Sequence, residues 1–198
     1  MRTLVAIVLL IAATSNSHAY DPNDLARLRR TGNCFGCNLK GANLRGADLY
    51  KTNMSSSDLR GVMLRGALMA NSNFIQANLR GANLSRTRMR WASFGRADLR
   101  GVDFTEADLA VSIMAFADLR GAVLIDANLG SARLHKANLA GAILRGAEIY
   151  HAKMRTVVGL TQEQLDQACG DKTTELPPGL RVEPCPAKPY KLPYDRKN

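Results

Sequence analysis

The feature that most constrains this chain is an apolar residue at every fifth position over more than half of its length. Steps of five from Leu39 to Met154 meet twenty-four Leu, Met, Phe or Ile residues with no break in register. The residue two places before each is small or β-branched, and sixteen of these residues are Ala. The residue directly before each large apolar residue is Asn or Asp in fourteen of the twenty-four cases.

A period of five fits neither regular secondary structure. On an α-helix five residues turn through about 500°, so the apolar positions would spiral around the surface. On a continuous strand alternate members of the series would face opposite sides. The pattern is satisfied if the chain turns a corner every five residues and points the small and the large residue inward. Glycine at nine corner positions supports this interpretation, because turns often need a positive φ.

A comparison at a spacing of twenty residues gives the number of corners in one coil. The segments that start at 37, 57, 77, 97, 117 and 137 read CNLKG, SDLRG, ANLRG, ADLRG, ADLRG and ANLAG. Each has Leu at its centre and Gly at its end. Four sides of five residues therefore predict a square coil of twenty residues and about six coils. At ~4.8 Å between paired strands, the repeat region is about 29 Å long.

The unit A-(N/D)-L-x-x, as in ANLRG at 42–46 and ADLRG at 97–101, resembles the pentapeptide-repeat family over residues 32–156. The flanks TGNCFGCNL at 31–39 and LTQEQLDQACG at 160–170 are similar to segments beside such repeats in exported bacterial members. The resemblance implies an all-β fold, a right-handed quadrilateral β-helix, and a protein of a mostly non-enzymatic kind.

Residues 1–19 predict a secretory signal peptide. Arg2 supplies the positive start, a short apolar run follows, and Ser17 and Ala19 are small residues at the positions that a signal peptidase requires. We expect cleavage after Ala19 and a protein that is exported to the periplasm or secreted. The alternatives are an uncleaved anchor and a buried strand. No other segment is long and apolar enough to predict a transmembrane helix in the mature chain.

Residues 20–31 predict a short helical cap on the first coil, because a solenoid exposes its core and strand edges at both ends. Asp21 is the expected N-cap, Leu25 and Leu28 share one face, and Gly32 is expected to end the helix. A docking element for a partner is the alternative role of such a helix, and association of two copies through the solenoid ends is left open.

Residues 157–175 predict a second helical cap. Thr161 and Gln164 form the pattern of a capping box, and Gly170 is expected to end the helix. The proline-rich residues 176–198 predict an extended surface tail.

Four cysteines in an exported protein favour disulfides. Cys34 and Cys37 both point into the first coil, either bridged across a corner or packed as thiols. Cys169 and Cys185 are expected to staple the tail. A four-cysteine zinc site is disfavoured because the two pairs belong to opposite ends of the rod. A thioredoxin-like role is disfavoured because the βαβ context is missing.

The most specific surface feature is a basic column at one exterior position of successive coils. It consists of Lys40, Arg60, Arg80, Arg100 and Arg120. The neighbouring column two residues earlier contains three Asp, so the basic column is either a solvated face laced to carboxylates or a docking strip for an anionic envelope polymer or lipid.

A second predicted contact patch surrounds the single Trp of the chain and contains Arg86, Arg88, Arg90, Trp91 and Arg96. Basic residues interleaved with an aromatic residue can bind nucleic acid. An exported compartment rarely offers nucleic acid, so a protein or an envelope polymer is the expected partner.

No Ser-His-Asp spacing, phosphate-binding loop or metal triad stands out, and His135 and His151 are interpreted as surface residues. We therefore predict no enzyme activity, no cofactor and no metal. The expected function is a rigid structural or protein-interaction scaffold, with binding of anionic envelope polymer or lipid as the alternative. Acidic mimicry of DNA, known among cytoplasmic members of the family, is disfavoured by the net charge of +10 and by the export signal.

Overall fold

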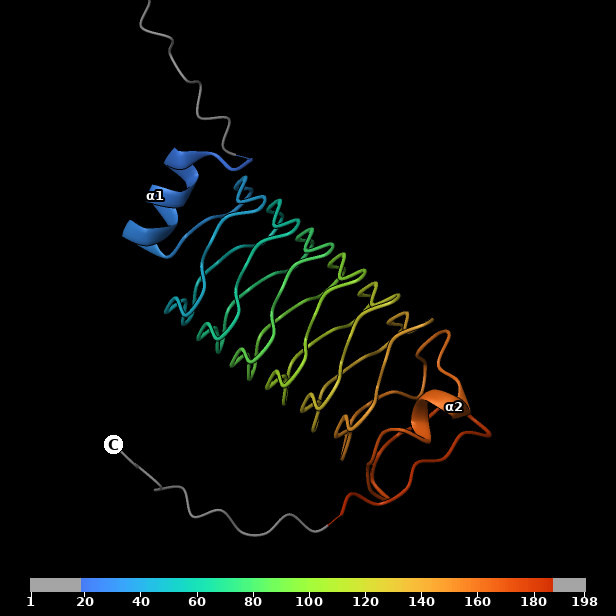
Figure 1. Cartoon of the computed structure of the whole chain (residues 1–198). Coiled ribbons are helices and arrows are strands. Elements are labelled where there is room, and N and C mark those ends of the chain that lie inside the picture. The colour runs from blue at the N-terminus through green and yellow to red at the C-terminus, as the bar shows by residue number, and fades with distance from the viewer. Residues whose placement is uncertain (1–18, 187–198) are drawn as a thin grey trace, which may run out of the picture.

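The computed structural model describes residues 19–186, which form one stack of coils with a helix near each end (Figure 1). The helices are α1 (Pro22–Thr31) and α2 (Gln162–Leu165). The predicted signal segment up to residue 18 and residues 187–198 of the predicted tail lie outside the described residues.

Parallel β-bridges join residues twenty positions apart, from Asn33↔Asn53 to Asn138↔Val158, which is the coil length predicted from the sequence. Each side of a coil contributes one bridged residue. The described residues therefore contain isolated bridges rather than strands of several residues. The coil has four walls, numbered here in chain order by their bridged residues. Wall 1 is built on residues 33, 53, 73, 93, 113, 133 and 153, wall 2 on 38 to 158, wall 3 on 43 to 143, and wall 4 on 48 to 148.

The backbone hydrogen bonds explain why the coils stack. On wall 2 the Leu39 N–H donates to the Asp58 carbonyl at 2.8 Å, and the Asp58 N–H donates to the Cys37 carbonyl at 2.8 Å. At the following corner the Ala42 N–H closes a turn on the Leu39 carbonyl at 3.0 Å. The remaining polar groups of each side are therefore satisfied by the adjacent coil, which fixes the twenty-residue register.

Every corner from residue 36 to residue 151 has a residue with φ between 53° and 72°. Glycine occupies only some of these positions, and fourteen other residues adopt the left-handed conformation, among them Trp91, Val111 and Phe116. The glycine pattern in the sequence therefore predicted the positive φ of the corners, but it marked only some of the corner positions. The conformation costs a non-glycine residue roughly 1–2 kcal/mol, and the ladder of hydrogen bonds imposes it regardless.

The Asn and Asp residues of the repeat complete the corners. All fourteen accept a hydrogen bond from the backbone N–H two residues later, as Asp58 does from Arg60 at 3.2 Å. Short polar side chains commonly bond their own backbone in this way. The prevalence of Asn and Asp thus has a structural cause.

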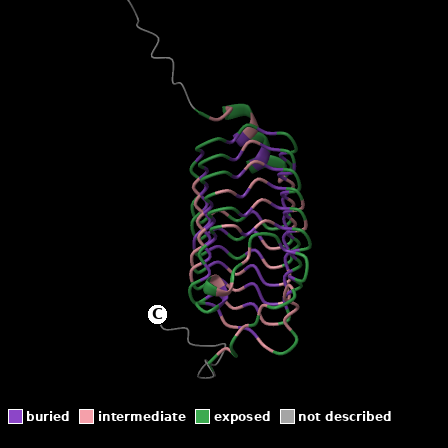
Figure 2. Ribbon diagram, turned by 90° about the vertical axis from the view of Figure 1, so that its right-hand side faces the viewer, coloured by how far each residue is buried: buried purple, intermediate pink, exposed green. Residues whose placement is uncertain are grey.

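The large residues of the five-residue series are buried along the whole stack, and Figure 2 shows that buried positions alternate with exposed ones around each coil. Phe74 and Phe94 stack with ring centroids 4.9 Å apart, and Phe104 meets Phe94 edge-on at 6.2 Å. The other buried residues are mostly Leu, Met and Ala, which accounts for an aromatic content of only 6%.

Three buried hydroxyl groups, those of Thr52, Ser72 and Ser112, lie in one inward column. Ser72 accepts from the Thr52 N–H at 3.2 Å and donates to the Leu49 carbonyl at 2.6 Å. Ser112 lies in the same column two coils later, is fully buried, and has no hydrogen-bond partner within the described part of the chain.

Helix α1 covers one end of the core. Asp21 accepts from the Asn23 N–H at 2.8 Å, and the Gly32 N–H returns to the Leu28 carbonyl with φ of 65° at Gly32. Leu25 and Leu28 belong to the buried core cluster. Asn38 of wall 2 donates its N–H to the Asp24 carboxylate at 2.8 Å, so the helix replaces an adjacent coil on this wall.

At the other end Thr161 and Gln164 form the predicted capping box, but α2 ends at Leu165 and the expectation of a helix up to Gly170 is wrong. The chain instead rejoins the ladder after α2. The Cys169 N–H donates to the Ala147 carbonyl at 2.9 Å, and bridges join Cys169 and later residues to walls 4 and 1. Pairing with the exposed edge of the last coil therefore outweighs further helical turns.

The first part of the predicted tail, residues 176–186, packs on the end of the rod. Leu176, Leu180 and Val182 are partly buried against the core, and Gly170 bridges Pro184. The expectation of an extended surface tail is therefore wrong for these residues, because the last apolar layer needs a cover.

Corner conformation predicts opposite effects of two exchanges. Gly81 has φ of 65°, and no atom lies within 4 Å of the point that a Cβ would occupy. Gly81→Ala should therefore lower the free energy of unfolding by about 1 kcal/mol through backbone strain alone. Val111→Gly should raise it by up to ~1 kcal/mol, since it relieves that strain. Urea unfolding followed by circular dichroism measures both. Equal stability of the two variants would contradict the imposed left-handed corner.

The hydroxyl column predicts a second contrast. Ser112→Ala removes a buried group without a partner among the described residues and should raise the free energy of unfolding by about 1 kcal/mol. Ser72→Ala leaves the Leu49 carbonyl without its donor and should lower it by ~1–2 kcal/mol. Thermal and urea unfolding of the two variants compare these values, and destabilisation by Ser112→Ala would show that its hydroxyl has a partner.

Candidate interaction surfaces

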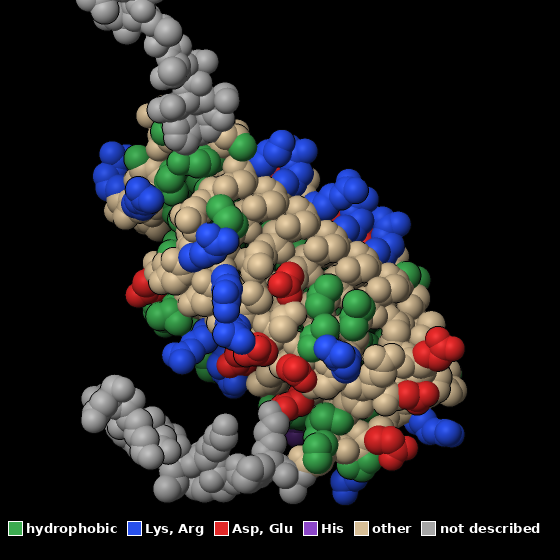
Figure 3. Space-filling view, viewed as in Figure 1, with side chains coloured by type: hydrophobic (Ala, Val, Ile, Leu, Met, Phe, Trp, Pro, Cys, Tyr) green, Lys and Arg blue, Asp and Glu red, His purple; other side chains and the backbone are tan. Residues whose placement is uncertain are grey.

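The predicted basic column runs along the corner between walls 2 and 3, and three of its five members are bound to carboxylates. Arg60, Arg100 and Arg120 reach the Asp two residues earlier with Nη2–Oδ2 distances of 2.5, 2.6 and 2.7 Å. Arg100 also lies 3.6 Å from the Asp118 carboxylate of the next coil. Figure 3 shows Lys and Arg side chains in a row along one long edge of the rod.

These contacts change the charge of the column. Hydrogen bonds from the Arg side chains hold the pKa of Asp58, Asp98 and Asp118 below the usual range, although partial desolvation acts in the opposite direction. The three carboxylates therefore stay ionised at neutral pH and offset three of the five cations. Lys40 and Arg80 follow Asn residues, which carry no charge to offset theirs, and they lie near the Asp58 and Asp98 carboxylates of the following coil.

The structure separates the members of the predicted Trp91 patch. Arg86 lies at the corner between walls 3 and 4 and pairs with Glu106 at 2.9 Å. Arg88 is exposed on wall 4. Arg90 stacks on the Trp91 ring at 5.1 Å and lies 3.6 Å from Asp108. The expectation of one patch is wrong for Arg96, because its corner comes two corners after that of Arg86 and is therefore diagonally opposite to it on the coil.

Arg96 belongs to a different cluster, which centres on Phe116. The Arg96 guanidinium lies 5.3 Å and the Lys136 Nζ 5.7 Å from the Phe116 ring centroid, and the His135 ring meets Phe116 edge-on at 5.4 Å. Residues 96, 116 and 136 are twenty apart, so a comparison of corner positions at that spacing would have found the cluster in the sequence. Reading along the chain did not.

The two histidines line one hollow of about 680 Å³ on wall 1 near the C-terminal end of the rod. The His135 Nδ1 lies 2.9 Å from the Thr156 hydroxyl, and the His151 Nδ1 contacts the Thr173 hydroxyl. Thr173 also bonds Asp171, whose pKa is lowered to about 2 mainly by this hydroxyl hydrogen bond. Each histidine thus bonds a Thr hydroxyl, and within residues 19–186 no group of three or more His, Cys, Asp or Glu could hold a metal ion.

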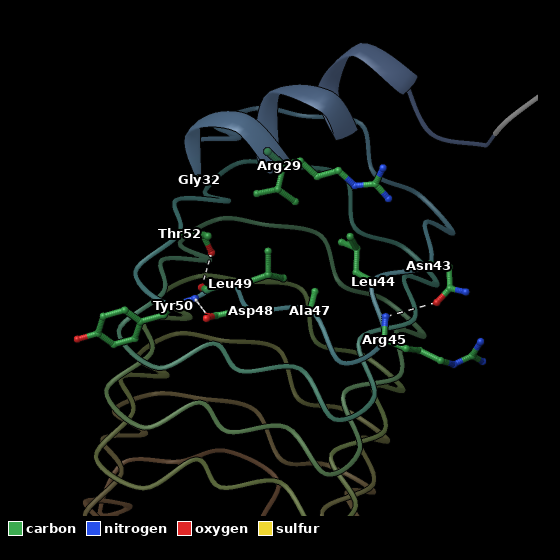
Figure 4. A pocket seen from close by; sticks show the side chains of 11 residues that line it. Arg29, Gly32, Asn43, Leu44, Arg45, Ala47, Asp48, Leu49, Tyr50 and Thr52 are labelled. Carbon is green, nitrogen blue, oxygen red and sulfur yellow. Dashed lines mark hydrogen bonds between the residues drawn. The ribbon is translucent and has the colours of Figure 1, made fainter.

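A second hollow of about 570 Å³ lies beside α1 at the opposite end, above walls 3 and 4 of the first coil. Figure 4 shows Leu44, Ala47 and Leu49 pointing from this coil toward the helix, with Arg29 on the helix above them. The floor is therefore the part of the first apolar layer that α1 leaves open. Association of copies through the solenoid ends stays a prediction.

Both expected cysteine pairs are close enough to bond, and the structure contains the Cys34–Cys37 and Cys169–Cys185 disulfides. The first lies in the buried first coil, and the second ties residues after α2 to the segment that covers the last coil. All four cysteines are thereby committed to structure, and the described residues contain no free thiol.

Neither helix of the described chain has the length and apolar character that crossing a lipid bilayer requires.

Solved structures of repeat proteins resemble parts of this chain. HetL, a pentapeptide repeat protein involved in heterocyst differentiation regulation from the cyanobacterium Nostoc sp. strain PCC 7120, is 29% identical over 60% of this chain, with a TM-score of 0.42. The match spans 56% of HetL.

Two further structures are pentapeptide repeat proteins. One from Nostoc PCC 7120 is 30% identical over 55% of this chain and 77% of its own, with a TM-score of 0.40. One from the Arabidopsis thaliana thylakoid lumen is 26% identical over 73% of this chain and 83% of its own, with a TM-score of 0.27. Among curated proteins no match is found.

The sequence model of pentapeptide repeats matches eight copies, in four overlapping segments at residues 33–66, 57–96, 87–124 and 122–158. The matched range is more than half of the chain and coincides with the bridged coils. Proteins of this kind fold as right-handed quadrilateral β-helices. The chain therefore belongs to the pentapeptide-repeat family.

Proposed function

We propose that this protein is an exported, non-enzymatic scaffold of about six coils, closed at both ends, that binds a partner protein through its walls. The observation that carries the proposal is the continuous backbone ladder from residue 33 to residue 158. A ladder of this kind fixes the positions of the outward side chains, so the walls present rigid columns that need little further ordering on binding.

The absence of catalysis is proposed from the roles that reactive residue types already have. The repeat Asn and Asp residues bond their own corners, the corner glycines adopt positive φ, and the cysteines form disulfides. Export is proposed from the signal-like residues 1–19, and two disulfides are compatible with an oxidising compartment.

Site-specific photo-crosslinking tests the scaffold. One photoreactive side chain is placed on each wall. The positions for walls 1 to 4 are Ile113, Val158, Val123 and Arg88. Within the described residues the side chains at these positions make no hydrogen bond that the exchange would break. We expect one wall to give the same crosslinked protein in repeated experiments on exported fractions. Crosslinks that are absent from all four walls, or equally spread over them, would overturn the proposal.

The alternative, an anionic polymer or lipid bound by the basic column, predicts a different result. Because Asp58, Asp98 and Asp118 offset three Arg, both members of each pair are exchanged, with Arg60, Arg100 and Arg120 changed to Gln and the three Asp to Asn. We expect this variant to reduce retention on anionic vesicles or glycans by less than about threefold. Retention is measured across a salt series against the unaltered protein. A loss of an order of magnitude would favour the alternative.

A further inference from the structure

Wall 1 differs from the other walls in its charge. Its residues and those of its two flanking corners contain no Asp or Glu in any coil; the segments are 30–36, 50–56, 70–76, 90–96, 110–116, 130–136 and 150–156. The acidic residues between 33 and 158 all lie on walls 2 to 4 and on the corners those walls share. At the end of wall 1, Glu175 from the segment after α2 pairs with Lys153 at 2.6 Å. The coils therefore concentrate their internal charge compensation on three walls.

Several cations of wall 1 and its corners are left without that compensation, and three of them lie close together along the rod. Arg96, Arg133 and Lys136 form no ion pair within the described residues, in contrast to Arg60 and Arg100 on the basic column. Arg96 and Lys136 come from the coils on either side of Phe116, and both lie against its ring. A carboxylate that docks beside the Phe116 ring would therefore lie close to two cations of the same sign and be attracted by both.

Apolar side chains lie among these cations. Ile75, Trp91, Ile113 and Phe116 are 40, 51, 38 and 46% exposed, and they come from wall 1 or from the corners on either side of it. Exposed apolar groups that cluster within a charged rim are typical of interaction sites. We call this surface the basic-apolar wall, and it consists of Ile75, Trp91, Arg96, Ile113, Phe116, Arg133 and Lys136.

We propose that the basic-apolar wall docks a segment of a partner protein that carries carboxylates next to apolar or aromatic side chains. The inference rests on the proposed scaffold function and names its surface and the chemistry of its partner. Trp and Arg are enriched among the residues that dominate protein interfaces. Uncompensated cations around an apolar centre select an acidic partner through electrostatic complementarity.

The geometry favours a protein over nucleic acid or a membrane. Arg90 lies over the Trp91 ring, and Arg96 and Lys136 lie over Phe116, so cations occupy the ring faces on which bases would stack. Membrane insertion needs apolar side chains that project beyond the cations. On this wall the apolar side chains are about half covered and lie beside their cations.

Peptide display tests the proposal. Random twelve-residue peptides are selected on the disulfide-intact protein, and Kd values of the enriched peptides are measured by fluorescence anisotropy. We expect the enriched sequences to combine Asp or Glu with Leu, Phe, Trp or Ile. Arg96→Gln, Arg133→Gln and Lys136→Gln together should weaken their binding about tenfold or more.

Two variants control for net charge and for folding. Arg60→Gln, Arg80→Gln and Arg120→Gln remove the same three charges from the basic column and should change Kd by less than about threefold. The second variant removes the apolar centre by the changes Trp91→Asn, Ile113→Asn and Phe116→Asn. The repeat already has Asn at a corner position, Asn71, and at a wall position, Asn73, so the fold should tolerate these changes. This second variant should also weaken binding about tenfold.

Three outcomes would overturn the proposal: enriched peptides that lack acidic residues, equal losses in the two charge variants, or binding to anionic phosphatidylglycerol vesicles that depends on the basic-apolar wall while no peptide binds. Failure of the scaffold itself is distinguishable. Crosslinks from Val123 on wall 3 with none from Ile113 on wall 1 would leave the scaffold in place and remove this inference.

Discussion

The hydrogen-bonded ladder between residues twenty apart is the interaction on which the rest of the structure depends. It ties Leu39 to Asp58 and repeats that connection from coil to coil. No coil can satisfy its backbone alone, so stability comes from stacking. For the same reason the stack needs covers at its ends, which α1 provides on one side and the segment after α2 on the other.

The ladder also determines what the corners tolerate. A residue such as Trp91 or Phe116 would avoid a positive φ in isolation, yet both adopt it here because the neighbouring coils fix the path of the chain. Corner side chains point away from the core. A large side chain at such a position therefore adds backbone strain, and in return the surface carries an aromatic group in a fixed position.

Much of this architecture follows from the sequence because it repeats. The inward Leu39 series and the coil of twenty residues are visible in the period alone. Features that break the period were harder to predict. Residues 166–186 pair and pack without a repeat, and Arg86 and Arg96 are close in sequence but lie on opposite corners. Grouping outward residues by wall, rather than along the chain, separates them.

Charge compensation distinguishes the walls more sharply than charge itself. The basic column has five cations, and three of them have an Asp partner two residues earlier on the same side. These ion pairs form when the chain folds, and a ligand could displace them only by breaking short hydrogen bonds. The coils place no carboxylate on wall 1. A binding partner would therefore compete with internal ion pairs at Arg60, Arg100 and Arg120, whereas Arg133 forms no ion pair within the described residues. Since an exposed internal pair and an intermolecular pair have similar strength, the wall whose coils lack internal pairs gains most from an acidic partner.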